Sequence, residues 1–217
     1  MKRYDLTLSK LVFVLISLSS IYVLIYNIFH FNPILGYDAE AHYSYVDFLS
    51  RYLPNDIKLP TKNDTREFFN PPLGYVVPAI AQVLCRNIIE SNNFLIECQP
   101  IYGKVTQIFQ SLLYIATIMI NLYTLKLFNK SNTFLNTGYL ILIPLFAVNY
   151  RTLSMIRGEP YILFFLSLFL LVIFKAEKNH FHFNFKFIFS AGVVIACIAL
   201  SRQWGFFLFI PLIYLLF

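Results

Sequence analysis

Two carboxylates and an imidazole stand close together after the first strongly apolar stretch of the chain. They are Asp38, Glu40 and His42 in the segment GYDAEAHYSYVDFL, which begins at Gly36. A carboxylate beside a substrate hydroxyl can act as a general base. Carboxylates also bind hard divalent cations, so Mg²⁺ or Mn²⁺ at Asp38 and Glu40 is an alternative use of the same pair.

Arginine side chains follow in two later connections between apolar runs. The segment NYRTLSMIRGEP contains Arg151, Arg157 and Glu159, and the turn SRQW contains Arg202. A guanidinium group can bind a phosphate through two parallel hydrogen bonds. Ionisable groups at the ends of apolar spans are costly to place near hydrocarbon and usually serve a substrate or an ion. These residue types therefore favour general-base chemistry beside a bound phosphate.

The elements that must position these residues are membrane helices. The chain is 58% hydrophobic and 13% charged, and its mean hydropathy is +0.64. Long uncharged runs recur along it, and a helix needs about 20 such residues to cross a bilayer. We predict an all-α membrane protein, one module over 1–217, with about six transmembrane helices. The predicted spans are 11–30, 105–125, 135–150, 159–174, 187–202 and 204–217.

The first and last spans bear on whether the sequence is complete. The first apolar run is longer than the core of a signal peptide, and FHFNP after it has no small-residue cleavage site, so we interpret it as a retained span. The last run ends in PLIYLLF without a polar exit. We interpret the sequence as a fragment or a shortened form. The later, shorter runs reach span length only by including charged residues such as Glu159 and Arg202.

The charge distribution predicts a multi-pass orientation. Basic residues precede the first span and follow every second crossing: Lys2, Arg3, Lys10, Lys126, Lys130, Lys175, Lys178 and Lys186. The positive-inside rule places this side, with the N-terminus, in the cytoplasm. Residues 31–103 then face the periplasm or the lumen, and they contain eight of the eleven acidic residues. The net charge of +6 therefore reflects topology and indicates no nucleic-acid partner.

The large external loop 31–103 is predicted to contain two interfacial helices. Asp38 occupies an N-cap position for a helix at about 38–53. Its apolar stripe consists of Tyr45, Phe48, Leu49 and Tyr52. Tyrosine favours the membrane interface, so we expect this stripe to lie on the membrane surface.

The second helix of the loop is predicted at about 72–90 as an interfacial or re-entrant helix. Its sequence is interrupted by three prolines, Pro71, Pro72 and Pro78. Cys85 and Cys98 both fall in the loop, where a disulfide can form. Two unpaired thiols fit the sequence equally well.

These segments resemble the GT-C superfamily of integral-membrane glycosyltransferases. The resemblance rests on GYDAEAHYSYVDFLSRYLP after the first span, then FFNPPLGYVVPAIAQVL, then RGEPYILFF. It points to polyprenyl-phosphate-sugar enzymes such as protein mannosyltransferases and lipid A aminoarabinose transferases. The family's acidic motif is matched by Asp38 and Glu40 as D-A-E, and its PPLYY-like segment by NPPLGY, from Asn70 to Tyr75. SRQWGFFLF is also similar to the dolichyl-phosphoglucose branch, so the sugar is left open.

The resemblance implies transfer of a sugar from a polyprenyl-phosphate donor to an acceptor hydroxyl on the outer membrane face, with inversion. Asp38 would be the general base, and Glu40 would orient the acceptor or share that role. Arginines can neutralise a monophosphate leaving group alone, so we expect no metal. The residues expected to bind substrate are Arg151, Arg157, Glu159, Arg202 and His42. The acceptor, whether protein, lipid or glycan, is not identified.

Simpler roles and other functions also fit these residues. Asp38 can be an N-cap and Glu40 a first-turn acid, while Arg157 and Glu159 can form an ion pair within a loop. A second functional class is a non-catalytic GT-C-like subunit or fragment that binds a lipid-linked substrate. A transporter is third, since helices broken at mid-membrane and an internal repeat would favour it, and the sequence shows neither.

Overall fold

The computed structural model describes residues 2–53, 55–56, 58–92, 97–128, 136, 138–139, 147–178, 185–210 and 213. Regular structure in these residues consists of seven α-helices and one 3₁₀ helix, without a strand. The predicted all-α class is therefore confirmed for the described part of the chain.

Three helices are long and apolar enough to cross a membrane. They are residues Lys10–His30 of α1 (Lys2–His30), residues Cys98–Leu127 of α4 (Cys98–Phe128), and α7 (Glu159–Lys178). Each overlaps a predicted span. Helix α7 starts at Glu159 and extends past the predicted end at 174 to Lys178, so its apolar run reaches span length by including charged residues at both ends. These helices make the chain a membrane protein by length and composition.

The last two predicted spans are shorter or different where they are described. Helix α8 (Phe185–Ser201) overlaps the predicted span 187–202 but has 17 residues, fewer than the about 20 that a straight crossing needs. The predicted span 204–217 begins as a 3₁₀ helix, η1 (Gln203–Leu208). Most of its second half lies outside the described residues.

The predicted span 135–150 falls largely outside the described residues. Within it, the structure describes 136, 138–139 and the start of a short helix, α6 (Ala147–Leu153). Helix α6 continues past the predicted end and leads into the connection before α7.

Helices α2 (Ala39–Tyr52) and α3 (Leu73–Asn92) correspond to the two helices predicted in the segment 31–103. Tyr45 and Leu49 of α2 are fully buried and pack with Tyr75 and Ala79 of α3. The rings of Tyr45 and Tyr75 stack with their centroids 3.9 Å apart. The expectation that this stripe faces the membrane is therefore wrong for Tyr45 and Leu49, because α3 supplies the apolar surface that covers them.

Helix α3 is continuous through one of its prolines and is tied to α4. Pro78 lies inside α3, so the predicted interruption there is wrong. A proline removes one helix hydrogen bond, and the packing of Tyr75 and Ala79 on α2 keeps the turn in place. Cys85 of α3 and Cys98, the first residue of α4, form a disulfide, which decides between the two alternatives left by the sequence.

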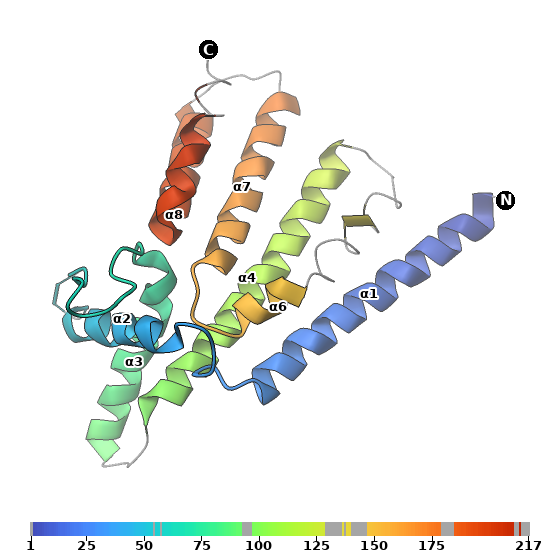
Figure 1. Cartoon of the computed structure of the whole chain (residues 1–217). Coiled ribbons are helices and arrows are strands. Elements are labelled where there is room, and N and C mark those ends of the chain that lie inside the picture. The colour runs from blue at the N-terminus through green and yellow to red at the C-terminus, as the bar shows by residue number, and fades with distance from the viewer. Residues whose placement is uncertain are drawn as a thin grey trace.

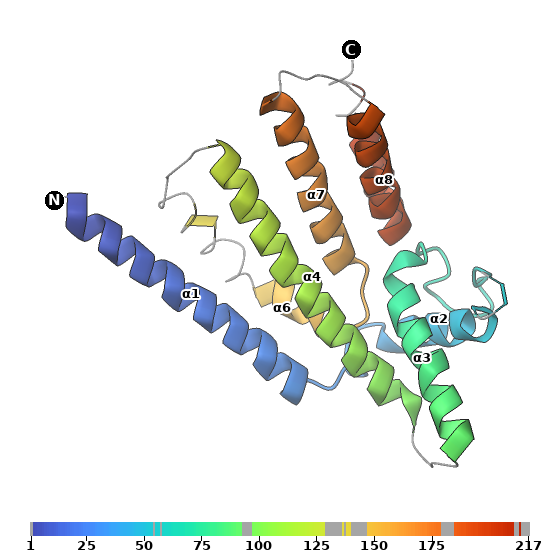
Figure 2. The ribbon, with the colours of Figure 1, turned by 180° about the vertical axis from the view of Figure 1, so that it is seen from behind.

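Four apolar helices lie next to one another. Figures 1 and 2 show α1, α4, α7 and α8 in a single row. The end of α1, the start of α4, the start of α7 and the end of α8 lie on the side where α2, α3 and α6 are found. Helix α7 packs against both α4 and α8. The short helices and connections therefore meet at one end of the row.

Polar side chains of α4 fix two of these connections in place. Lys104 Nζ donates a hydrogen bond of 2.7 Å to the carbonyl of Phe31, which follows α1. Gln107 Nε2 donates to the carbonyl of Ser154 at 2.7 Å, and Gln110 Nε2 donates to that of Met155 at 2.9 Å. Helix α4 thereby anchors both the segment before α2 and the segment between α6 and α7.

Candidate functional site

Two glycines let the connection between α6 and α7 approach both α8 and α3 at this end of the molecule. A Cβ atom on Gly158 would lie 2.5 Å from the carbonyl oxygen of Ser201, the last residue of α8. A Cβ atom on Gly74 would lie 3.2 Å from the Cα atom of Gly158. Any larger side chain at Gly158 would force these segments apart. The connection between α6 and α7 thus touches both the end of α8 and the first turn of α3.

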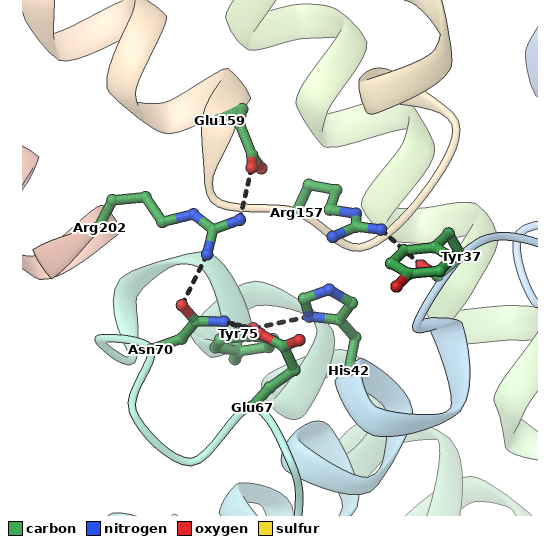
Figure 3. A network of polar contacts seen from close by, with 8 residues as sticks. All are labelled: Tyr37, His42, Glu67, Asn70, Tyr75, Arg157, Glu159 and Arg202. Atoms are coloured by element: carbon green, nitrogen blue, oxygen red, sulfur yellow. Dashed lines mark hydrogen bonds and ion pairs between the residues drawn. The ribbon is translucent and has the colours of Figure 1, made fainter. Parts of the chain in front are cut away.

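Arg202 lies at the centre of the resulting polar network (Figure 3). Its Nη2 atom donates to Glu159 Oε1 at 2.5 Å, and its Nη1 atom donates to Asn70 Oδ1 at 2.6 Å. Its side chain is only 17% exposed. Glu159 therefore holds an arginine in position, and that arginine is Arg202. The simpler alternative, an ion pair of Glu159 with Arg157, is not what forms.

Arg157 binds the backbone directly before Asp38. Its Nη2 atom donates to the carbonyl oxygen of Tyr37 at 2.5 Å. A cavity of about 290 Å³ lies beside it. The residues that line this cavity are Tyr37, Arg151, Thr152, Met155, Arg157 and Glu159. Three of the predicted substrate-binding residues therefore surround one space, and Arg202 is joined to it through Glu159.

Asp38 has an unusual backbone conformation at the edge of this site. Its φ angle is 57° and its ψ angle 15°, and no other non-glycine residue in the described part of the chain has a positive φ. An N-cap side chain reaches the first helical N–H groups from an extended backbone. In the left-handed conformation the Asp38 carboxylate makes no capping hydrogen bond, so its interpretation as a side-chain cap is wrong. The left-handed region costs on the order of 1 kcal/mol.

Glu40 does not lie beside Arg151, Arg157 or Arg202. Its side chain is exposed and lines a separate cavity of about 220 Å³. The other lining residues are Ala41, Ser44, Lys62, Asn63, Asp64, Thr65 and Arg66. Asp38 precedes α2 with a left-handed backbone, whereas Glu40 belongs to the first turn of the helix, so helical spacing does not pair the two side chains. Among the described residues, no group of three His, Cys, Asp or Glu side chains is placed to hold a metal ion.

His42 lies in the site and is almost completely buried, with 2% exposure. Its Nδ1 atom is 2.7 Å from the hydroxyl of Tyr75. Burial lowers the pKa of His42 to about 3, and the positive charges of Arg157 and Arg202 act in the same direction. The imidazole is therefore neutral over the physiological range of pH.

Three network residues were not predicted as functional from the sequence. Asn70 Nδ2 donates to the hydroxyl of Tyr75 at 3.1 Å and to the carboxylate of Glu67. Burial raises the pKa of Tyr75, so its hydroxyl keeps its proton. Asn70 and Tyr75 are the first and last residues of NPPLGY, the segment that carried part of the family resemblance. That motif was the only signal for them, and Glu67 had none.

No family model, curated protein or solved structure matches this chain, so the site has to be interpreted from its own geometry.

Proposed function

We propose that this protein is a membrane glycosyltransferase that moves a sugar from a polyprenyl-phosphate donor to an acceptor hydroxyl. The observation that carries the proposal is the cavity of about 290 Å³ at the ends of the apolar helices, where Arg157 binds the backbone beside Asp38. A lipid-linked sugar has an apolar tail, a phosphate and a sugar. Its phosphate needs cationic donors at the membrane edge, and its sugar chemistry needs a base.

In the proposed reaction Asp38 removes the proton from the acceptor hydroxyl. The acceptor oxygen attacks the anomeric carbon as the bond from that carbon to the phosphate oxygen breaks. The bonding electron pair leaves with the polyprenyl phosphate, and attack from the opposite side inverts the anomeric centre. Asp38 is suited to this role because its carboxylate is not used to cap α2.

The arginines supply electrostatic stabilisation in this proposal. Arg157 and Arg151 line the cavity, so they are suited to donate hydrogen bonds to the departing phosphate. Arg202 already donates to Glu159 and Asn70. We therefore propose that it contributes positive electrostatic potential to the site and holds Asn70 in place. Glu159 holds Arg202 in position.

We also propose that this end of the molecule faces outward, in a chain with about six spans. Lys126 belongs to the last turn of α4, and Lys175 and Lys178 belong to the last turn of α7. Glu159 is at the opposite end of α7. The positive-inside rule would place these lysines in the cytoplasm. The donor would then be used on the periplasmic or lumenal face.

The alternative function is a non-catalytic membrane subunit that binds the lipid-linked donor for a partner protein. The observation that favours it is that Glu40, one member of the acidic pair implied by the family resemblance, lines a different cavity from the one beside Arg157. A donor-binding protein would need the arginines and would not need a base.

The test is turnover by the full chain, purified in detergent, with a small panel of polyprenyl-phosphate sugars and candidate acceptors. Asp38→Asn removes the base, and Asp56→Asn changes an exposed carboxylate in the connection between α2 and α3 as the matched control. We expect turnover in the wild type and in Asp56→Asn, with loss in Asp38→Asn. Donor binding without turnover in all three proteins supports the non-catalytic alternative. No binding of any donor contradicts both.

A further inference from the structure

A ring nitrogen of His42 in the site is buried without a hydrogen-bond partner in the described part of the chain. His42 Nε2 has no hydrogen-bond partner among the described residues, although His42 is only 2% exposed. Buried polar atoms are nearly always hydrogen-bonded, so an exception needs an explanation. Figure 3 shows the ring with one nitrogen bonded to Tyr75 and the other turned toward the guanidinium of Arg157.

The direction of each hydrogen bond behind His42 follows from Arg202. A guanidinium can only donate, so the atom of Asn70 that Arg202 contacts at 2.6 Å must be the carbonyl oxygen Oδ1. The amide nitrogen of Asn70 then donates to the hydroxyl oxygen of Tyr75. The proton of this buried hydroxyl is satisfied by donation to His42 Nδ1, 2.7 Å away.

This direction determines the tautomer of His42. A neutral imidazole that accepts at Nδ1 has its proton on Nε2. The low pKa of His42, caused by burial and by the two arginines, keeps the ring neutral. The unpartnered atom is therefore an N–H donor that faces another donor, Arg157. Two donors that face each other need an acceptor between them.

We propose that His42 donates a hydrogen bond from Nε2 to a phosphoryl oxygen shared with Arg157, and that Arg202 fixes this donor through Asn70 and Tyr75. The proposal rests on the proposed function, because it assigns a residue to the phosphate of the same donor. His42 is a ligand-binding residue in this scheme, and Tyr75 is a positioning residue. Glu159 Oε2 is buried and has no hydrogen-bond partner within the described residues, so it offers an acceptor for a hydroxyl of the same ligand.

The tautomer can be measured without any activity. The full chain, labelled with ¹⁵N-histidine in detergent, has four histidines, and the signal missing from His42→Gln identifies His42. We expect a protonated Nε2 and an unprotonated, hydrogen-bonded Nδ1 at neutral pH. A proton on Nδ1, or on both nitrogens, overturns the proposal.

A pair of tyrosine variants tests the positioning role. Tyr75→Phe keeps the ring that stacks on Tyr45 and removes the hydroxyl that donates to His42. Tyr43→Phe removes a hydroxyl from α2, the helix that contains His42, and that hydroxyl is not bonded to His42. We expect the proton distribution of His42 to change in Tyr75→Phe and to stay unchanged in Tyr43→Phe. An unchanged tautomer in Tyr75→Phe contradicts the role given to Tyr75.

The ligand is tested with farnesyl phosphate and with inorganic phosphate at the same concentration. We expect farnesyl phosphate to shift the Nε2–H signal saturably, and its affinity to fall at least about tenfold in Tyr75→Phe, the effect of one hydrogen bond to a charged group. A shift with inorganic phosphate alone supports the donor role of His42 but contradicts the lipid-linked substrate. Binding that depends on Arg157 yet leaves the His42 signal unmoved overturns only this inference. No binding overturns both proposals.

Discussion

The two faces of α2 differ in how their surroundings are built. On one face, called the Asp38 face, His42 is affected by the charges of Arg157 and Arg202, and Arg157 binds the backbone directly before Asp38. Both arginines come from distant parts of the chain. Glu40 and Ser44 lie on the other face, called the Glu40 face, and line a cavity completed by residues 62–66. One face depends on long-range contacts and the other on a neighbouring loop.

The loop beside Glu40 is folded by its own short-range bonds. Asp64 Oδ2 accepts hydrogen bonds from the backbone N–H and the hydroxyl of Thr61, at 2.8 Å and 2.7 Å. These bonds lower the pKa of Asp64. Thr65 donates to the carbonyl of Ala41 at 2.6 Å and attaches the loop to α2. Local hydrogen bonds thus explain this cavity. At the Asp38 face, by contrast, His42 Nε2 and Glu159 Oε2 are buried without a partner among the residues that the structure describes.

The strongest test of the comparison is to neutralise one carboxylate on each face. Asp38→Asn should lower turnover with a polyprenyl-phosphate sugar by about 10²–10⁴-fold, the usual contribution of a general base. Glu40→Gln, on an exposed side chain, should change turnover by no more than about twofold. Steady-state rates at saturating donor measure both. Equal losses in the two variants would show that the faces act together and would contradict the distinction between the Asp38 face and the Glu40 face.

The second test removes one arginine beside each cavity. Arg157→Gln should weaken binding of farnesyl phosphate by about 10- to 100-fold, because a hydrogen bond to a charged group is lost. Arg66→Gln removes the same charge beside Glu40 and should leave the affinity within about twofold of the wild type. Equilibrium binding in detergent measures this. A comparable loss in Arg66→Gln would mean that only the overall positive charge matters.

The same contrast explains what the sequence could predict. The helices at 39–52 and 73–92 and the three long apolar helices follow from local periodicity and hydropathy. The positive-inside pattern predicted that Asp38, Arg157 and Arg202 lie at the same end of the helices. It could not predict that Glu40 turns away, because this depends on where α2 begins and on its rotation. The contacts of Asn70 with Arg202 and of Tyr75 with His42 depend on tertiary packing.

The third test separates the segments that build the Asp38 face. Gly158→Ala places a Cβ atom 2.5 Å from the Ser201 carbonyl, so the end of α8 must move. We expect a loss of about 1–3 kcal/mol in stability, with weaker phosphate binding as Arg202 shifts. In Gly192→Ala the new Cβ atom of α8 meets no atom within 4 Å, so that variant should be neutral or stabilised by up to about 1 kcal/mol. Thermal unfolding in detergent compares them, and an unaffected Gly158→Ala would show that the close approach is not needed.

The smallest expected effect is a pH dependence that belongs to the buried face alone. The pKa of His42 is about 3 in the folded protein and about 6.5 in an unfolded chain. Between these values the unfolded state binds more protons, so stability rises with pH through this window and is lost as the pH falls below about 6.5. The groups that face the imidazole are Arg157, Arg202 and the hydroxyl of Tyr75. From pH 7.5 to 5.5 the loss of stability should be roughly 1.4 kcal/mol.

This loss of stability should disappear in His42→Gln and persist in His30→Gln, whose side chain is exposed. Melting curves of the three proteins at the two pH values measure the difference, and an equal drop in His42→Gln and wild type would mean that His42 is not held neutral by burial.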